Sequence, residues 1–272
     1  MELGYREHED FVLGVRFTRG DFGALPTVTR EFIQQGVDVL VLGSTSALNA
    51  ATEIAPKTPI IFVAALDPVA LGAVRSYARP GGNLTGVTTE DVELSPKRLE
   101  LFRALVPGLK RVLFAYDGGN AASALELKAY REASRTLGIE LVERDLRTQA
   151  DAQRTFTQLR KSDVQAIVAP FAVTLNIPGF VVETTSRLHL PTMFHTDFYV
   201  ERGGLASYGA NLHESGRQAA RILDKVIRGV RPGDIPIEAN NRVEFVVNAR
   251  VARAINLAIP RDLIPRIDRV LE

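Results

Sequence analysis

Two patterns of apolar and polar positions alternate along this chain. Short runs that are almost wholly apolar, such as VDVLVL at residues 37–42, are typical of strands buried on both faces. Between them lie stretches with helical spacing, such as residues 25–35, which Gly36 closes. This alternation predicts an α/β fold in which parallel sheets carry helices on both faces.

The same patterns predict the individual elements. The expected strands are residues 11–17, 37–42, 59–63, 84–87, 111–115, 139–144, 166–169, 191–194, 205–208 and 243–247. The expected helices are residues 25–35, 47–54, 95–106, 123–137, 150–160, 178–188, 212–228 and 251–255. Ser95 and Pro96 read as the start of one helix, and Ser123 with Glu126 as the capping box of another. A length of 272 residues favours two lobes, with the second doubly wound unit starting near Ser95.

Composition excludes several classes of function. The 33 Lys and Arg residues nearly balance the 32 Asp and Glu residues, so the basic excess of a nucleic-acid surface is absent. With no Cys there is no disulfide, thiolate nucleophile, Cys-bound zinc or iron–sulfur cluster. No apolar run reaches the roughly 20 residues that cross a bilayer. The first residues do not read as a signal peptide.

Motifs of catalysis are also missing from the sequence. There is no G-x-G-x-x-G after a strand, no phosphate-binding loop, no H-E-x-x-H and no nucleophile elbow. The four His residues are scattered and read as surface or packing residues. The sequence therefore predicts no catalytic residue, no metal site and no cofactor.

Small polar and aromatic residues follow the predicted strands, where open α/β sheets bind ligands. The candidate ligand-binding residues are Ser44, Thr45, Ser46, Asp67, Tyr116, Asn120, Phe171, Thr174, Asp197 and Tyr208. Ser44 to Ser46 lead into a helix N-terminus, which suits a carboxylate, and Asp67 and Asp197 suit an ammonium group. Tyr116, Phe171 and Tyr208 suit an apolar or aromatic group. The alternative is that Ser44 to Ser46 and Asp67 only cap helices.

Two long segments resemble the ABC-transporter substrate-binding proteins of the tryptophan/tyrosine type. They are DPVALGAVRSYARPGGNLTGVT at residues 67–88 and the stretch GGLASYGANLHESGRQ onward at residues 203–260, with the closing IPRDLIPRIDRVLE. The resemblance covers nearly the whole chain. It implies a type I periplasmic-binding fold: two doubly wound parallel-sheet lobes joined by three crossovers, near Asp91, Gly203 and Pro236. Lobe one is then residues 1–90 plus 204–235, and lobe two is residues 91–203 plus 236–272.

The resemblance also implies the function. The chain is expected to be a periplasmic solute-binding protein that closes on a small aromatic or amino-acid-like carboxylate and presents it to a membrane permease. Lobe one would supply Ser44, Thr45, Ser46, Asp67 and Tyr208, and lobe two the other candidates. Because Trp is absent, Phe or Tyr must form any stacking wall.

One departure from the family concerns its usual first strand, which is missing before Leu3-Gly4-Tyr5. We hypothesise that residues 11–17 and 37–42 pair directly, or that a partner chain covers the open edge as in a homodimer, because unpaired backbone groups invite association.

Two other classes remain as alternatives. A sensor domain like that of the lactose repressor shares the fold but carries a helix-turn-helix, for which there is no room before Phe11. A two-lobe racemase or lyase needs a clustered acid/base pair, and the sequence shows none.

Overall fold

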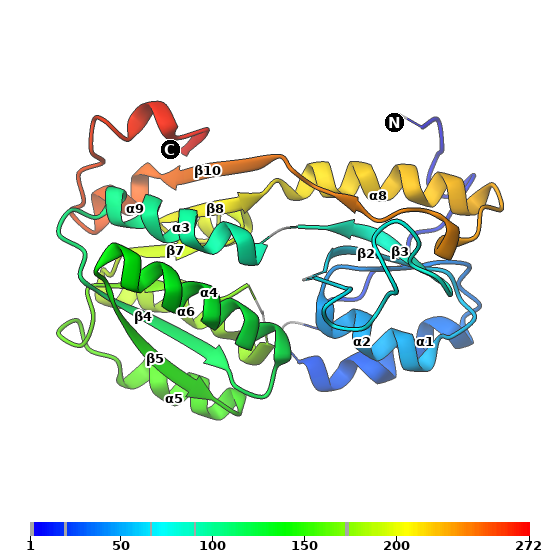
Figure 1. The fold of residues 1–272 in the computed structure, drawn as a ribbon, viewed down its shortest axis with the longest axis horizontal. Coiled ribbons are helices and arrows are strands. Elements are labelled where there is room, and N and C mark those ends of the chain that lie inside the picture. The colour runs from blue at the N-terminus through cyan, green and yellow to red at the C-terminus, as the bar shows by residue number, and fades with distance from the viewer. Residues whose placement is uncertain (1–2, 19–20, 66, 90, 172–173) are drawn as a thin grey trace. The chain divides into compact units, whose positions relative to one another are not determined.

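The chain folds into two compact units (Figure 1). The computed structural model describes residues 3–18, 21–65, 67–89, 91–171 and 174–272. The first unit comprises Met1–Thr89 and His213–Asn240, and the second comprises Glu90–Leu212 and Asn241–Glu272. Both units combine a sheet with covering helices, which confirms the predicted α/β class.

The first unit is built on a four-stranded parallel sheet with the order β1-β2-β3-β9. Its strands are β1 (Leu40–Leu42), β2 (Ile60–Ala65), β3 (Leu84–Thr88) and β9 (Glu238–Ala239). Ile60, Ile61 and Phe62 are fully buried, so the central strand contributes side chains to both faces of the sheet. This burial explains why the strand reads as a continuous apolar run.

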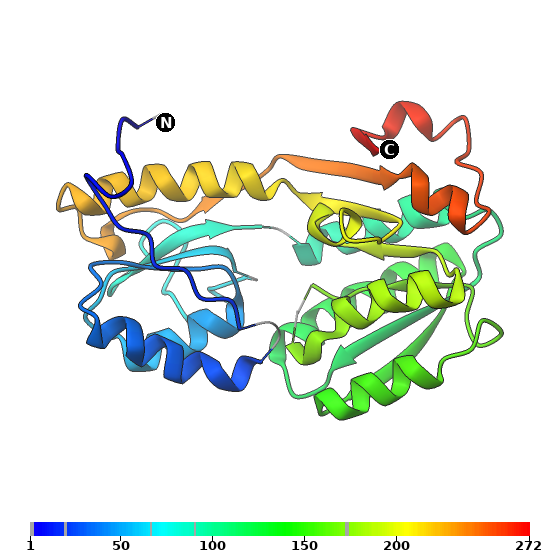
Figure 2. The same ribbon diagram turned by 180° about the vertical axis from the view of Figure 1, so that it is seen from behind.

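Helices cover both faces of this sheet (Figure 2). They are α1 (Leu25–Gln34) and α2 (Thr45–Ile54) on one face and α8 (Leu212–Ile227) on the other, with short turns of 3-10 helix at Phe22–Ala24 and Pro232–Asp234. In α8 the buried Ala219, Ile222 and Val226 lie on one stripe, at the spacing an amphipathic helix requires.

The N-terminal segment corrects one prediction. Residues 12–18 form no strand, and β1 pairs only with β2 in the described part of the chain, so direct pairing of residues 11–17 with residues 37–42 is wrong. The segment instead runs from α8 to α1: Tyr5 donates a hydrogen bond to Asp224 Oδ1 at 2.7 Å, and Arg16 lies over the ring of Phe32. Its apolar side chains stay exposed, with Phe17 at 85%, because no strand of the described part of the chain covers them.

The second unit contains a seven-stranded sheet with the order β11-β10-β8-β7-β6-β4-β5. Its strands are β4 (Arg111–Asp117), β5 (Glu140–Leu146), β6 (Ala166–Val168), β7 (Thr192–Phe194), β8 (Ala206–Ala210), β10 (Val243–Asn248) and β11 (Arg269–Leu271). All neighbouring pairs are parallel except β10 with β8. The antiparallel pair of β10 and β8 makes this a mixed sheet, whereas the sequence predicted parallel strands throughout.

Helices again lie on both faces of this sheet. One face carries α3 (Asp91–Leu105), α4 (Ala121–Leu137) and α9 (Ala249–Ala254), and the other carries α5 (Gln149–Gln158) and α6 (Ile177–Leu188). Short helical turns complete the unit at Thr174–Asn176, α7 (Asp197–Val200) and Ile264–Arg266. Among the described residues, no helix is long and apolar enough to cross a membrane.

Two boundaries differ from their predicted positions because of strand pairing. Residues 204–212, expected in lobe one, belong to the second unit, since β8 pairs with β7 and β10. Residues 236–240, expected in lobe two, belong to the first unit, since β9 pairs with β3.

The predicted start of α3 is also wrong. The helix begins at Asp91, so Ser95 is a buried residue inside it rather than its N-cap. Pro96 sits in the second turn, where its missing N–H removes a single helical hydrogen bond.

Candidate ligand-binding site

In the first unit, Ser44 to Ser46 follow β1 and begin α2. Ser44 is the N-cap of this helix, and its Oγ accepts a hydrogen bond from the backbone N–H of Ala47 at 3.2 Å. Thr45 and Ser46 are the first two residues of α2. The capping interpretation of Ser44 is thus correct, and the N–H groups of the first turn still point to the carboxyl end of β1.

Asp67 follows β2, the direct neighbour of β1, so it lies at the same edge of the sheet as Ser44. Its Oδ1 accepts hydrogen bonds from the backbone N–H of Ala70 at 3.0 Å and from the hydroxyl of Tyr77 at 3.0 Å. Its Oδ2 makes no hydrogen bond to the described residues. Asp67 therefore caps a turn and keeps one carboxylate oxygen for a further partner.

In the second unit, four candidates lie at or after the carboxyl ends of the neighbouring parallel strands β4, β6 and β7. Tyr116 is the penultimate residue of β4, and Asn120 is the N-cap of α4, with its Oδ1 accepting from the N–H of Ala122 at 2.9 Å. Phe171 comes after β6 and Asp197 after β7. The strand order β7-β6-β4 brings these positions to one edge of the sheet. The side chain of the remaining candidate, Thr174, lies outside the described part.

Phe171 is held by a buried carboxylate. Its backbone N–H donates to both oxygens of Glu126, at 2.8 and 2.9 Å. Glu126 is 1% exposed, so the capping box predicted for Ser123 and Glu126 is wrong: Asn120 caps α4 instead. The ring of Phe171 contacts the ring of His195 edge-on, with centroids 4.9 Å apart.

His195 is buried between aromatic rings. Besides Phe171, its imidazole contacts the ring of Tyr199 edge-on, and its Nδ1 has no hydrogen-bond partner in the described part of the unit. Burial, aided by the positive charge of Arg98, lowers the pKa of His195 to about 3. The imidazole is therefore neutral over the whole physiological range.

Asp197 is occupied by a cation of its own unit. Its Oδ2 accepts a hydrogen bond from Arg269 Nη2 at 2.6 Å, and the two groups form an ion pair. Asp197 is also the first residue of α7, where a carboxylate is favourable. This arrangement weakens its predicted role opposite a ligand ammonium, because the charge is already neutralised.

Tyr208 lies in β8 and thus in the second unit, not in the lobe where it was expected. Its carbonyl oxygen accepts a hydrogen bond from Nε of Arg98 at 2.7 Å. Arg98 is fully buried, and its Nη1 also donates to the hydroxyl of Tyr130 at 3.1 Å. Burial raises the pKa of Tyr130 to about 12, so its hydroxyl stays protonated.

Sequence reasoning missed Arg98, Glu126 and Tyr130. Glu126 was predicted to belong to a capping box, and no prediction concerned Arg98 or Tyr130. Two of the three bond positions far away in the chain: Arg98 is 110 residues from Tyr208, and Glu126 is 45 residues from Phe171. The spacing of Glu126 and Tyr130, one helical turn apart, was the only available signal that they share a face.

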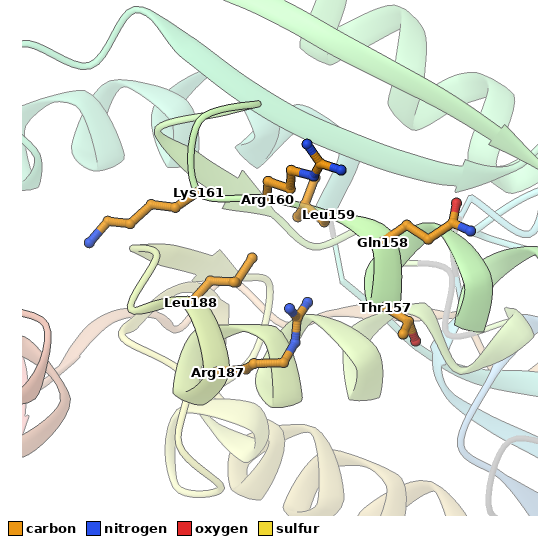
Figure 3. A pocket seen from close by; sticks show the side chains of 7 residues that line it. All are labelled: Thr157, Gln158, Leu159, Arg160, Lys161, Arg187 and Leu188. Atoms are coloured by element: carbon orange, nitrogen blue, oxygen red, sulfur yellow. The ribbon is translucent and has the colours of Figure 1, made fainter.

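A hollow of about 730 Å³ lies elsewhere in the second unit (Figure 3). It is lined by Thr157, Gln158, Leu159, Arg160, Lys161, Arg187 and Leu188. These residues end α5 and α6, just before the chain enters β6 and β7 at their amino ends. None of the predicted ligand residues lines it, since those follow the carboxyl ends. Among the described residues, no cluster of His, Asp or Glu could hold a metal ion.

Known proteins are similar to this chain in sequence and in fold. The tyrosine-binding protein of Clostridioides difficile (strain R20291) is 24% identical over 257 residues, which are 94% of this chain and 74% of that protein. A solved structure from Streptococcus pneumoniae, an ABC domain in complex with L-Trp, has a TM-score of 0.86 and 24% identity, and the match covers 99% of this chain and 90% of that chain. A conserved domain protein from Vibrio cholerae gives the same values. These structures show the shared fold.

The match to a protein family extends over almost the entire sequence. Residues 1–270 match the family model described as ABC transporter substrate binding protein. The match includes both segments on which the resemblance was based, and it spans both compact units. This chain therefore belongs to the family of ABC transporter substrate-binding proteins.

Proposed function

We propose that this chain binds an aromatic or amino-acid-like carboxylate between its two units, closes on it by a hinge motion, and delivers it unchanged to a membrane permease of an ABC importer. Membership of a family of binding proteins, which are not catalytic, carries the proposal. A ligand that contacts both lobes favours the closed form by its differential affinity. We place the protein in the periplasm, where such a component meets its solute before the permease does.

The chemistry of the candidate residues supports an aromatic amino acid. The N-terminus of α2 at Ser44 offers N–H groups to a carboxylate, and the remaining oxygen of Asp67 suits an ammonium group. Tyr116, Phe171 and Tyr208 are partly buried aromatic residues at or near the strand ends of the second unit. The relatives point the same way, since one is named for tyrosine and another was solved with L-Trp.

A fluorescence titration tests this proposal. The chain has no Trp, so the emission of added L-tryptophan is observed without background from the protein when it is excited at a wavelength that the six tyrosines do not absorb. We expect a saturable change in that emission, and competition by L-tyrosine. Ligand at 100 times its dissociation constant should raise the free energy of unfolding by about 2.7 kcal/mol.

The variant Asp67→Asn separates the ligand role of this residue from its capping role. Asn keeps an oxygen for the N–H of Ala70 but loses the charge, so we expect near wild-type stability and an affinity about tenfold lower or weaker. Unchanged affinity in this variant would remove Asp67 from the site. If the wild-type chain binds no amino acid, aromatic acid or sugar, the proposed function is contradicted.

We also infer that a second copy of this chain covers the open edge of β1. In the part of the chain that the structure describes, β1 pairs only with β2, residues 12–17 form no strand, and Val41 is 51% exposed. These features favour strand addition by another copy. Sedimentation analysis should show a concentration-dependent dimer that Val41→Lys weakens by about tenfold or more. A wild-type monomer at every concentration would show the inference to be wrong.

A further inference from the structure

The interior of the second unit contains charged side chains that the proposed function has not used. Arg98 on α3 is fully buried, and Glu126 on α4 is 1% exposed. Both charges act on the hydroxyl of Tyr130: Arg98 lowers its pKa and Glu126 raises it, while burial dominates. Arg98 also donates to the hydroxyl of Tyr130 at 3.1 Å, and Tyr130 follows Glu126 by one turn on the buried face of α4. We call these three buried side chains the Arg98–Glu126 network.

This network ends on backbone atoms of two candidate ligand residues. Glu126 accepts the N–H of Phe171 with both oxygens, and Arg98 donates to the carbonyl of Tyr208 at 2.7 Å. Phe171 lies beyond the end of β6 at Val168, and Tyr208 lies beyond the last pair of β8 with β7, at Ser207, although it still pairs with Phe245 of β10. At both positions a charged side chain therefore bonds a backbone group beyond the end of a parallel strand pair.

Stability alone gives no reason for these charges. The surrounding core of α3, α4 and the sheet is apolar, with Phe114 packed on Tyr130 at a centroid distance of 4.8 Å. Apolar side chains of similar volume often replace a buried ionic network without loss of stability. What apolar side chains cannot do is bind the N–H of Phe171 and the carbonyl of Tyr208 in fixed directions.

We propose that the Arg98–Glu126 network positions Phe171 and Tyr208 for the ligand, so that affinity depends on side chains that do not touch it. This proposal rests on the proposed function. Arg98, Glu126 and Tyr130 are positioning residues, held on two helices that pack against each other. Charge-assisted hydrogen bonds from rigid elements are the means by which a site is preorganised.

The test compares Glu126→Gln with Thr192→Val in L-tryptophan titrations well below the melting temperature. Gln keeps the shape but loses the charge, so we expect the dissociation constant to rise about tenfold and the amide of Phe171 to exchange faster with solvent. Thr192 is a buried control in the same sheet: its Oγ1 accepts the N–H of Leu205 at 3.1 Å at the amino end of β7. Thr192→Val should lower the melting temperature and leave affinity within about twofold.

Several outcomes would overturn the proposal. Wild-type affinity in Glu126→Gln contradicts it, and so does an equal loss of affinity in Thr192→Val, which would mean general loosening. If Glu126→Gln does not fold, Tyr130→Phe, which removes only the hydroxyl that Arg98 reaches, should weaken binding about threefold, and an unchanged affinity overturns the proposal. If the wild-type chain binds no aromatic amino acid, the proposed function fails first and this proposal with it, whereas failure in the variants alone leaves the proposed function standing.

Discussion

Replacing Arg98 with Met is expected to lower the free energy of unfolding of the second unit by about 3–5 kcal/mol. The side chain is fully buried, and its loss leaves the carbonyl of Tyr208 without its donor. It also removes one of the two opposite charges that act on the pKa of the buried Tyr130, while the charge of Glu126 stays in the same interior. Removing one member of a buried charged group costs far more than replacing the whole group, since the remaining charge stays in a medium of low dielectric.

Urea denaturation followed by tyrosine fluorescence measures this loss. Four of the six tyrosines, at positions 116, 130, 199 and 208, lie in the second unit, so the signal reports mainly on that unit. Arg103→Met is the matched control: Arg103 is on the same helix and also donates to a carbonyl, that of Leu137, but it is exposed. It should cost at most about 1 kcal/mol. Equal costs for the two variants would show that the burial of Arg98 is not decisive.

The sequence was most informative where periodicity reflects burial directly. The stripe of α8 and the apolar runs of β2 and β4 are consequences of packing within one element, so pattern alone located them. Residues 11–17 have the composition of a strand, but residues 12–17 pair with no strand among the described residues, because strand formation depends on a neighbour that the pattern cannot specify. For the same reason the predicted unit boundaries differ from the observed ones: the unit to which β8 and β9 belong is set by the strands with which they pair.

The candidate site could be predicted only at the level of the sheet edges. The rule that ligands follow the carboxyl ends of parallel strands selects Ser44, Asp67, Tyr116 and Phe171 as candidates. It could not show that Asp197 is paired with Arg269, since these residues are 72 positions apart. Nor could it show that Glu126 turns inward. A carboxylate on a helix usually faces water, and only the three-dimensional structure shows that the carboxylate of Glu126 accepts a hydrogen bond from the N–H of Phe171.

Acid should destabilise the second unit through His195. Burial lowers the pKa of His195 in the folded state to about 3, whereas the pKa of His in the unfolded chain is about 6.5. Between these two pH values the unfolded chain therefore binds a proton at His195 and the folded chain does not. The contribution of this group to stability is complete above about pH 6.5 and is lost as the pH falls toward about 3, at about 1.4 kcal/mol per pH unit. Between about pH 7 and about pH 5, the wild-type chain should thus lose about 2 kcal/mol of unfolding free energy from His195.

His195→Phe should flatten this dependence, because Phe fills the space between Phe171 and Tyr199 and takes up no proton. His189→Asn is the control: His189 is exposed in the same unit, and Asn tolerates its left-handed backbone, with φ at 54°. Urea denaturation at the two pH values should show the wild-type slope in His189→Asn and little slope in His195→Phe. The paired carboxylates, such as Glu143 beside Arg131, do not confuse the result, because that ion pair lowers the pKa of Glu143 and moves its titration to more acidic pH. A wild-type slope that persists in His195→Phe would mean that some other group carries the acid sensitivity and that the buried imidazole is not its source.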